Sequence, residues 1–331
     1  TRVLTRRIAY LLAERNVAPF EVLAITFTNK AAGEMKERVA QLVGDRAKVM
    51  WVSTFHSACV RLLRLEAHRL GFSNSFSIYD SADSLRLVTI VAKELNLDPK
   101  RYPPRQFQSM ISNAKNELLG PQDYLNATTN QFEQVVADVY AVYQKRLQSA
   151  NAMDFDDLIL NTVKVIQSFP EAKARMRSRF KHILVDEYQD TNTAQYTLVK
   201  LLVGVMGQFT EVGDDDQSIY AWRGAKPENM ALLKDDFHNL KVIKLEQNYR
   251  STSRILKAAN AVIENNPHIF DKKLWSDKGH GETIRVITCL NDDDEAELKK
   301  LGVIYFNNSI IKIKGSGVNL DEFSFSKMPS F

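Results

Sequence analysis

Cysteine is scarce in this sequence, and long apolar runs are missing from it. The 331 residues include two cysteines, Cys59 and Cys289, which lie far apart. A disulfide framework and a cysteine-rich metal site both need closely spaced cysteines, so neither is expected, and a reducing cytoplasm is the expected compartment. No stretch reaches the roughly 20 apolar residues that a membrane-spanning helix requires, so no membrane partner is expected.

A complete glycine-rich phosphate-binding loop is also missing. Gly315 and Gly317 are not followed by Lys-Ser or Lys-Thr, so this pair is expected to form only a turn. The length favours two or three domains. A net charge of +4 and a pI near 8.8 permit nucleic-acid binding without establishing it.

Apolar strands alternate with amphipathic helices along much of the chain, which predicts a parallel α/β sheet. Between about residues 81 and 169 apolar residues recur at helical spacing, so an all-helical insertion is expected there. The expected helices cover residues 4–12, 29–43, 57–70 and 227–234, and the expected strands cover 22–27, 49–52, 183–185, 209–212, 242–245 and 282–289.

The segment 183–192, ILVDEYQDTN, carries the most chemical information. Its apolar triplet runs directly into Asp186 and Glu187, and the carboxyl ends of buried parallel strands are where α/β proteins place their chemistry. One carboxylate there can hold Mg²⁺ and its neighbour can take a proton from water, which are the two requirements of nucleotide hydrolysis. The alternative is an ordinary acidic strand end at the surface.

A second polar segment, GDDDQSIYAWRG at residues 213–224, also follows an expected strand. Gln217 offers a donor and an acceptor, which suits the sensing of a γ-phosphate and its water. Tyr220, Trp222 and Arg223 place two aromatic rings and a cation close together, a combination that holds single-stranded bases. The alternative is core packing for Trp222 and a capped turn for the acids.

Four further segments carry weaker signals. Arg250 could neutralise charge on a transferring phosphoryl group and Tyr249 could stack on adenine, although a solvated arginine and a half-buried tyrosine explain that segment equally well. Residues 26–32 and 53–57 follow strands and begin helices, where hydroxyl, amide and backbone N–H groups suit phosphates. Phe27 could contact bases or fill the core. Asp154 is expected to cap a helix.

The order and spacing of these segments closely resemble the UvrD/Rep/PcrA family of superfamily 1A DNA helicases. The resemblance rests on TFTNKAAGEM, STFHSACVRLLR, MDFDDLI, ILVDEYQDTN, VGDDDQSIYAWRGA and LEQNYRS, in that order, and runs to about residue 297. It implies two RecA-like P-loop NTPase domains, each interrupted by an insertion. The first motor domain (1A) would span 1–80 and 175–240, the 1B insertion 81–174, and the start of the second motor domain (2A) 241–297.

The same resemblance implies ATP and Mg²⁺ as cofactors and single-stranded DNA, or its junction with duplex, as the partner. Thr1 and Asp186 would bind Mg²⁺, and Arg2 would lie near the nucleotide. Glu187 would activate the attacking water. Gln217 would couple the γ-phosphate to DNA, while Arg250 would reach that phosphate and Tyr249 the adenine. The residues expected to grip DNA are Phe27, Asn29, Thr54, His56, Tyr220, Trp222 and Arg223. Movement would run 3′ to 5′, in DNA repair or replication restart.

In this family a glycine-rich loop stands before the threonine that Thr1 matches, and the rest of 2A and a 2B domain follow. Residues 1–331 alone are therefore expected to show negligible ATP hydrolysis and no unwinding. The family motifs do not continue into residues 298–331, which are expected to be a foreign tail. Two other functions stay open: a passive single-strand-binding remnant, and the motor part of a RecB/AddA-like helicase–nuclease. The presence of Asp186, Glu187 and Arg250 favours a catalytic ancestor.

Overall fold

The computed structural model describes residues 1–204, 208–221, 224–284, 291, 293 and 296. The chain divides into two compact units, Thr1–His238 and Asn239–Phe331, and each is considered by itself. No helix in the described part of the chain is long and apolar enough to cross a membrane.

A four-stranded parallel sheet organises the first unit. Its strand order is β2-β1-β5-β6, so consecutive strands in the sequence are not always neighbours and helical connections must cross over the sheet. The bounds are β1 Val22–Thr26, β2 Trp51–Thr54, β5 His182–Val185 and β6 Gln208–Glu211. All three strand pairings are parallel, which confirms the predicted parallel α/β sheet.

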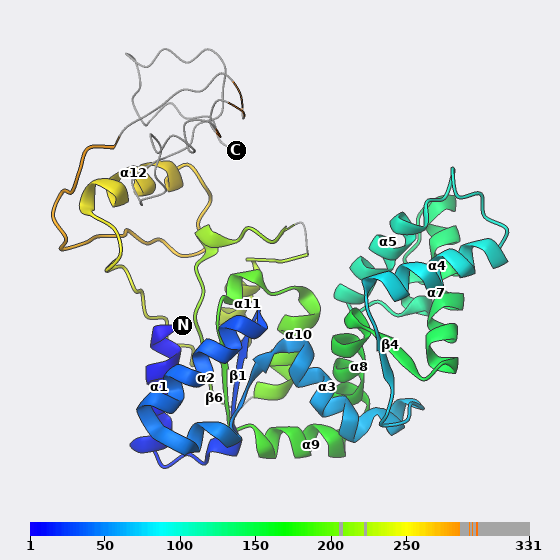
Figure 1. Cartoon of the computed structure of the whole chain (residues 1–331), viewed down its shortest axis with the longest axis horizontal. Helices are drawn as coiled ribbons and strands as arrows, with labels where there is room; N and C mark the ends of the chain where they lie inside the picture. The colour runs from blue at the N-terminus through cyan, green and yellow to red at the C-terminus, as the bar shows by residue number, and fades with distance from the viewer. Residues whose placement is uncertain (205–207, 222–223, 285–290, 292, 294–295, 297–331) are drawn as a thin grey trace. The chain divides into compact units, whose positions relative to one another are not determined.

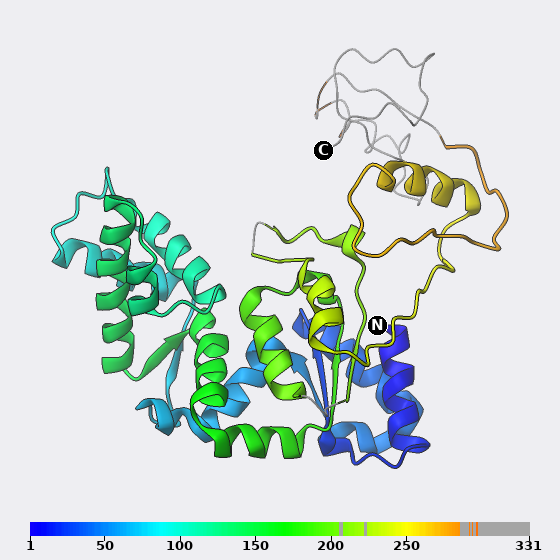
Figure 2. The ribbon, with the colours of Figure 1, turned by 180° about the vertical axis from the view of Figure 1, so that it is seen from behind.

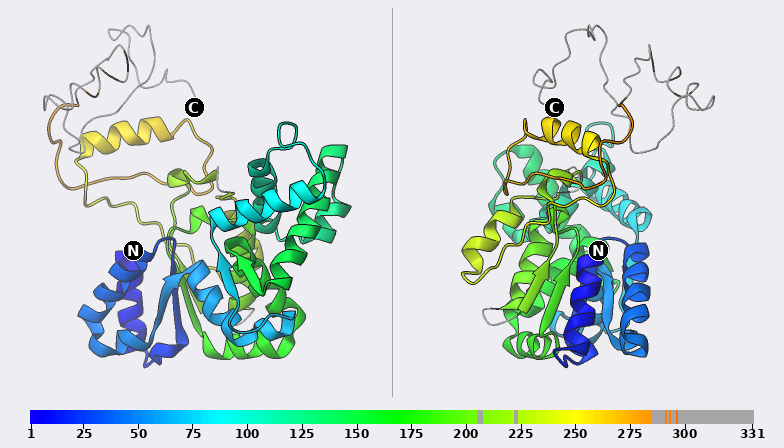
Figure 3. Two further views of the ribbon diagram at one scale, coloured as in Figure 1. Left: turned by 45° about the vertical axis from the view of Figure 1, so that its right-hand side comes forward. Right: turned by 90° about the vertical axis from the view of Figure 1, so that its left-hand side faces the viewer.

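Helices cover both faces of this sheet. Figure 3 shows α1 (Arg2–Ala13) and α2 (Asn29–Val43), coloured blue, together on one side. Their apolar residues form one cluster with the strands, in which Ile8 and Met35 join Ala24 and Leu184. The other face packs against α3 (Phe55–Glu66) and α10 (Thr193–Val203), which contact β1 and β5 respectively. The result is a three-layer α/β/α arrangement (Figure 1).

The segment between β2 and β5 carries the predicted insertion. In Figures 1 and 2 its helices α4, α5 and α7 lie side by side, around a core that includes Phe107, Tyr140 and Tyr143. The bounds are α4 Ser81–Glu94, α5 Pro104–Asn116, α6 Pro121–Asn126, α7 Gln131–Ser149, α8 Phe155–Ser168 and α9 Pro170–Arg179.

The insertion is not helical throughout. A short strand, β4 (Ala152–Asp154), pairs in parallel with β3 (Ser77–Tyr79), which stands just before the insertion. A three-residue strand has too few residues to show an alternating pattern, so helical periodicity on either side conceals it. This two-stranded ladder ties the entrance of the insertion to its exit, and α8 then packs on α3 and α10 beside the main sheet.

Several element ends differ from expectation. Residues 49–52 were predicted as a strand, but η2 (Gly44–Val49), a 3₁₀ helix, occupies the first of them and the strand begins at Trp51. The helix predicted for 57–70 changes to a 3₁₀ turn, η3 (Ala67–Leu70), before Gly71 ends it with φ of 81°. The other 3₁₀ turns are η1 (Pro19–Glu21), η4 (Tyr188–Asp190) and η5 (Asp215–Gln217). The helix predicted for 227–234 is α11 (Asn229–Asp236).

In the second unit the prediction of a strand at 242–245 is wrong. Val242, Ile243 and Leu245 are exposed, and no strand lies beside them in the described residues. Apolar content alone suggested a strand, but a strand also needs a neighbour to complete its backbone hydrogen bonds. The unit contains α12 (Ser253–Ile263) and an isolated bridge between Gln247 and Trp275. Residues 282–284 are not strand, and the rest of the strand predicted for 282–289, like residues 298–331, lies outside the described residues.

Candidate active site

The carboxyl ends of the parallel strands bring several of the predicted residues to one edge of the sheet. Phe27 follows β1, Thr54 ends β2, and Asp186 follows β5. Gly213 begins the loop two residues after Glu211 ends β6. Residues that are far apart in the sequence thus share the edge at which open parallel sheets place their ligands.

Asp186 lies beneath this edge and is almost completely buried, with 2% of its surface exposed. Thr1 Oγ1 donates a hydrogen bond to Asp186 Oδ2 at 2.6 Å, and the Thr1 amino group is 3.2 Å from Oδ1. The Asp186 amide donates to the Ile25 carbonyl at 3.0 Å, which fixes the backbone as a continuation of β5. A hydroxyl and a carboxylate so close together are the oxygen donors that Mg²⁺ prefers.

Glu187 has an exposed side chain on a strained backbone. Its φ and ψ are 52° and 46°, the left-handed region that side chains other than glycine seldom adopt. This turn reverses the chain at the end of β5, so Asp186 points into the fold while Glu187 faces solvent. Strain of this kind, held by surrounding structure, is common at functional sites.

Gln189 connects Glu187 to the loop after β6. Only 2% of Gln189 is exposed. Its Nε2 donates to Glu187 Oε2 at 3.0 Å, and its Oε1 accepts from the Asp214 amide at 3.0 Å. Asp214 Oδ2 in turn accepts from Gln217 Nε2 at 2.5 Å. A chain of hydrogen bonds therefore joins Glu187 to Gln217, and sequence reasoning assigned no role to the buried glutamine that carries it.

Aromatic side chains gather near the ends of β1 and β2. Phe27 and Phe55 meet edge to face with their ring centroids 5.7 Å apart, and His56 and Phe155 do so at 5.8 Å. Burial lowers the pKa of His56 below its ordinary value, so the ring is neutral at pH 7 and suited to packing or hydrogen bonding rather than to charge pairing. Phe155 is a candidate that sequence reasoning missed, because its segment was interpreted only as a helix cap.

That cap is present as predicted. Asp154 Oδ1 accepts from the Asp157 amide at 2.8 Å and begins α8. Phe155 is the next residue and is 48% exposed, although aromatic side chains at the start of a buried helix would be expected to turn inward. The signal available in the sequence was an aromatic residue placed inside an acidic capping segment, where nothing apolar is needed.

The remaining predicted DNA contacts differ in exposure. Thr54 is mostly buried and caps α3, accepting from the Ser57 amide at 3.3 Å, so its hydroxyl already has a structural role. Asn29, the first residue of α2, is exposed, as is Tyr220. Trp222 and Arg223 lie outside the described residues.

Three residues predicted to contact the nucleotide from outside the sheet edge, Arg2, Tyr249 and Arg250, are exposed. Arg2 is the first residue of α1. Tyr249 and Arg250 belong to the second unit, where the Tyr249 hydroxyl donates to Gln247 Oε1 at 2.8 Å and the Arg250 amide donates to Asn248 Oδ1 at 2.9 Å. The Asn248 contact holds the backbone of the LEQNYRS segment in a turn, and the side chains of Tyr249 and Arg250 are both exposed.

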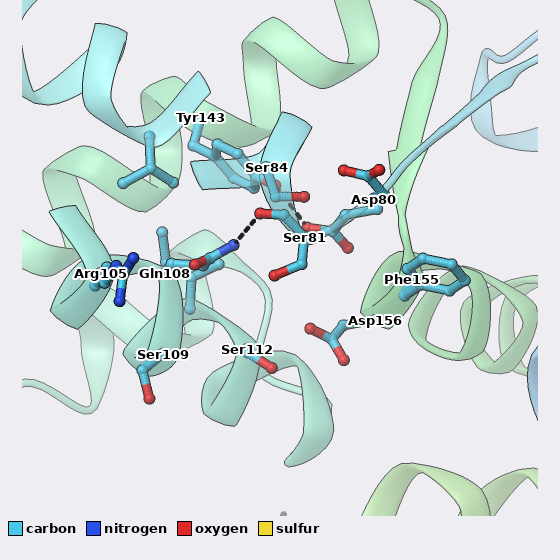
Figure 4. A pocket seen from close by; sticks show the side chains of 13 residues that line it. Asp80, Ser81, Ser84, Arg105, Gln108, Ser109, Ser112, Tyr143, Phe155 and Asp156 are labelled. Carbon is cyan, nitrogen blue, oxygen red and sulfur yellow. Dashed lines mark hydrogen bonds between the residues drawn. The ribbon is translucent and has the colours of Figure 1, made fainter. Parts of the chain in front are cut away.

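A separate cavity of about 270 Å³ lies where α4, α5 and the start of α8 meet. Figure 4 shows Ser81, Gln108, Ser112 and Asp156 around it, with Gln108 Nε2 donating to the Ser81 carbonyl at 2.8 Å. Burial and the charge of Asp154 raise the pKa of Asp156 to about 6. The cavity is lined by the insertion and its entrance, and it shares Phe155 with the aromatic side chains near the ends of β1 and β2.

Two family models and curated relatives match this chain. Residues 1–238 match the UvrD/REP helicase N-terminal domain, and residues 243–315 match the UvrD-like helicase C-terminal domain. The chain belongs to the UvrD/REP helicase family. The second match continues to residue 315, past the limit near residue 297 that the motifs suggested.

Relatives of this UvrD/REP-family chain include two helicases. It is 51% identical to an ATP-dependent DNA helicase PcrA of Staphylococcus aureus, over 90% of this chain and 41% of the relative. It is 53% identical to the ATP-dependent DNA helicase UvrD1 of Mycobacterium tuberculosis, over 89% of this chain and 40% of the relative. The chain thus spans about two fifths of the length of these relatives.

One acidic residue near the helicase-family site has a carboxylate oxygen that accepts no hydrogen bond in the described part of the chain. Glu211 ends β6, and its Oε2 is buried without a hydrogen-bond partner in the described part of the chain. Burial raises the pKa of Glu211 from its ordinary value of 4.5 to about 8. Folded Glu211 therefore binds a proton that the unfolded chain releases, so its contribution to stability is present below pH 4.5 and is lost as the pH rises to about 8.

Replacing Glu211 with methionine is expected to remove this pH dependence. The variant should be about 1–3 kcal/mol more stable than the wild type at pH 8.5, because an unpaired buried carboxylate is eliminated, and should differ less at pH 5. Urea unfolding at both pH values measures the difference. Glu14→Met, at an exposed position, is the matched control. If the free energy of unfolding changed equally with pH in the wild type and in Glu211→Met, the expectation would be contradicted.

Proposed function

We propose that this chain forms the first motor domain, and the beginning of the second, of an ATP-dependent DNA helicase that moves 3′ to 5′ on single strands. The cytoplasm is the proposed compartment, and DNA repair or replication restart the proposed setting. The observation that carries the proposal is the pairing of Thr1 with buried Asp186, directly beside exposed Glu187. A hydroxyl and a carboxylate suited to Mg²⁺, beside an exposed second carboxylate, would supply two of the roles that hydrolysis of a nucleoside triphosphate requires.

Mg²⁺ fits the donor set at Thr1 and Asp186. When bound, it would neutralise charge on the phosphates of ATP. Asp186 is held in place by the sheet and by burial, and the ion would replace the contacts that its two oxygens make with Thr1. Glu187 is the proposed base that takes the proton of the attacking water, and Gln217, exposed on η5, is the proposed contact to the γ-phosphate. Arg2 would lie near the nucleotide.

The aromatic side chains support a single-stranded DNA partner. Phe27, His56, Phe155 and Tyr220 offer ring surfaces, and bases can stack on such rings whatever their identity. Asn29 at the start of α2 would add contacts to phosphates, and Thr54 would support that track through its cap on α3. Trp222 and Arg223 are proposed to join them on the strength of the sequence. Junctions between single and double strands are the proposed substrate for unwinding.

Arg250 and Tyr249 are the proposed contribution of the second motor domain. The guanidinium would neutralise charge on the γ-phosphate, and the tyrosine ring would stack on adenine. Their support is the exposure of both side chains on a turn fixed by Asn248 and Gln247.

The proposal is tested with a full-length form, in which residues 1–331 replace the matching two fifths of a relative. We expect single-stranded DNA to stimulate its ATP hydrolysis, and a duplex with a 3′ tail to be separated. A DNA affinity that ATP analogues leave unchanged, with no hydrolysis, would instead support a passive single-strand binder. DNA cleavage by the same full-length form would support the helicase–nuclease alternative.

Phe155→Ala is expected to weaken single-strand binding by the chain of residues 1–331. Loss of one stacking ring should cost about 1–3 kcal/mol of binding free energy. Fluorescence anisotropy with a labelled thymidine oligonucleotide measures the dissociation constant. Phe20→Ala is the matched control, because Phe20 is 54% exposed but precedes β1, at the opposite end of that strand. If Phe155→Ala and Phe20→Ala changed the dissociation constant equally, the DNA would not bind at Phe155.

A further inference from the structure

The buried side chain of Gln189 joins the residues directly after β5 to the residues directly after β6. Its amide donates to Glu187 and accepts from the Asp214 amide, both at 3.0 Å. We propose that Gln189 is a positioning residue, which transmits the state of residues 214–220 to Glu187. The inference deepens the proposed function and rests on it, since it takes Glu187 as the base and Gln217 as the phosphate contact.

The chemistry of the position requires a primary amide. A carboxylate in place of Gln189 could accept from Asp214 but could not donate to Glu187, and its charge would repel the Glu187 carboxylate. An apolar side chain could do neither. The loss of the Gln189 acceptor would leave the Asp214 N–H without this hydrogen bond.

The backbone around Gln189 strengthens the connection. A side chain at Gly213 would bring its Cβ to 3.1 Å from Gln189 Oε1, so glycine at this position allows the loop to approach the amide. The Gln189 carbonyl also lies 3.5 Å from Ser218 Oγ, a long hydrogen bond. Gln189 therefore contacts both ends of the segment 214–218, and Gln217 lies between these two contacts.

The arrangement gives a physical route from DNA to the proposed base. Tyr220 stands two residues beyond Ser218 and is exposed for stacking. The planar amide of Gln189 keeps its donor and its acceptor at a fixed distance from each other, so a rotation that follows a displaced Asp214 N–H also moves the donor bonded to Glu187. A shift of residues 214–220, caused by a base on Tyr220 or a phosphate on Gln217, therefore changes the orientation of Glu187.

The contact itself can be tested without nucleotide. In the chain of residues 1–331, hydrogen exchange measured on peptides that cover residues 210–221 should reveal a protected amide at Asp214. Gln189→Met should speed its exchange about 10-fold or more. Gln195→Met is the matched control: Gln195 is also buried and accepts from a backbone amide, that of Asn192 at 3.1 Å, but it does not reach Glu187. Unchanged exchange in Gln189→Met would overturn the inference.

The coupling is tested in the full-length form with and without single-stranded DNA. Gln189→Met should lower the DNA-stimulated kcat about 10-fold or more, with the KM for ATP and the Kd for DNA within about twofold of wild type. Gln195→Met should retain the wild-type kcat. In the double variant Gln189→Met/Gln217→Ala, kcat should fall no further than in the more impaired single variant, because both act through one chain of hydrogen bonds.

The outcomes separate the inference from the function on which it rests. A wild type that does not hydrolyse ATP would refute the proposed function, while the exchange experiment would still report on the Gln189 contact. A hydrolysing wild type whose Gln189→Met variant keeps its DNA-stimulated kcat within about twofold would overturn the coupling alone. So would losses that multiply in the double variant, which indicate two independent defects.

Discussion

Replacing Glu187 with glutamine is expected to lower the ATP turnover of the full-length form by at least about 100-fold, the usual contribution of a general base. Glutamine has nearly the same shape and keeps an oxygen that can accept from Gln189 Nε2, so the turn at Glu187 should persist. It cannot take a proton from water. The release of phosphate in the presence of single-stranded DNA measures the loss of kcat.

Binding should survive this substitution. The KM for ATP and the affinity for a single-stranded oligonucleotide are expected to stay within about threefold of wild type, because the proposed role of Glu187 is to act on the attacking water. Glu14 is exposed and caps the end of α1 opposite to Thr1, so Glu14→Gln should leave turnover unchanged. Turnover of Glu187→Gln within about threefold of wild type would assign the base to another residue.

Replacing Lys115 with methionine is expected to destabilise the first unit by about 3–5 kcal/mol. The Lys115 side chain is fully buried, with Nζ 2.7 Å from Asp154 Oδ2 and 2.8 Å from Asp157 Oδ1. Burial acts to lower the pKa of Lys115, but the charges of Asp154 and Asp157 outweigh it and raise the pKa above its ordinary value. Without the ammonium, two neighbouring carboxylates would remain buried and mutually repulsive.

Chemical unfolding followed by circular dichroism measures this loss. Lys145→Met, on the exposed side of α7, is the control and should change stability by less than about 0.5 kcal/mol. The triple variant Lys115→Met/Asp154→Asn/Asp157→Asn should recover part of the stability, because it removes the uncompensated charges. If Lys115→Met alone lowered the free energy of unfolding by less than about 1 kcal/mol, Lys115 would not be stabilising the Asp154 and Asp157 carboxylates.

The strands of the first unit were predictable because each is a short apolar run that ends in polar residues. β1 and β5 are buried throughout or nearly so and precede Phe27 and Asp186, and both were identified within one residue. The error at β2 arose because residues 44–49 contain apolar positions that a 3₁₀ turn can also satisfy. The strand predicted for 242–245 failed because pairing with a neighbour cannot be deduced from local hydrophobicity.

The resemblance to UvrD/REP helicases is confirmed by the family match over residues 1–238. The roles of individual residues and the bounds of the 1A, 1B and 2A domains stay predictions. The structure supports some of these predicted roles more than others. Asp186 and Thr1 lie in contact, which favours their role as metal ligands. Thr54 is mostly buried and already caps a helix, which favours a DNA contact less.

The amino-acid sequence alone determined the chemistry present and the order in which it occurs. Asp186, Glu187 and Gln217 could be singled out as candidates because a dense polar run after a buried strand is costly unless it binds something. Their proximity depended on the sheet order β2-β1-β5-β6, which places β5 and β6 side by side and is set by long-range packing. Gln189 shows the difference most clearly. Its neighbours in the sequence do not reveal its partner, because Asp214 reaches it only when β6 pairs with β5 and the intervening helix α10 folds back over the sheet.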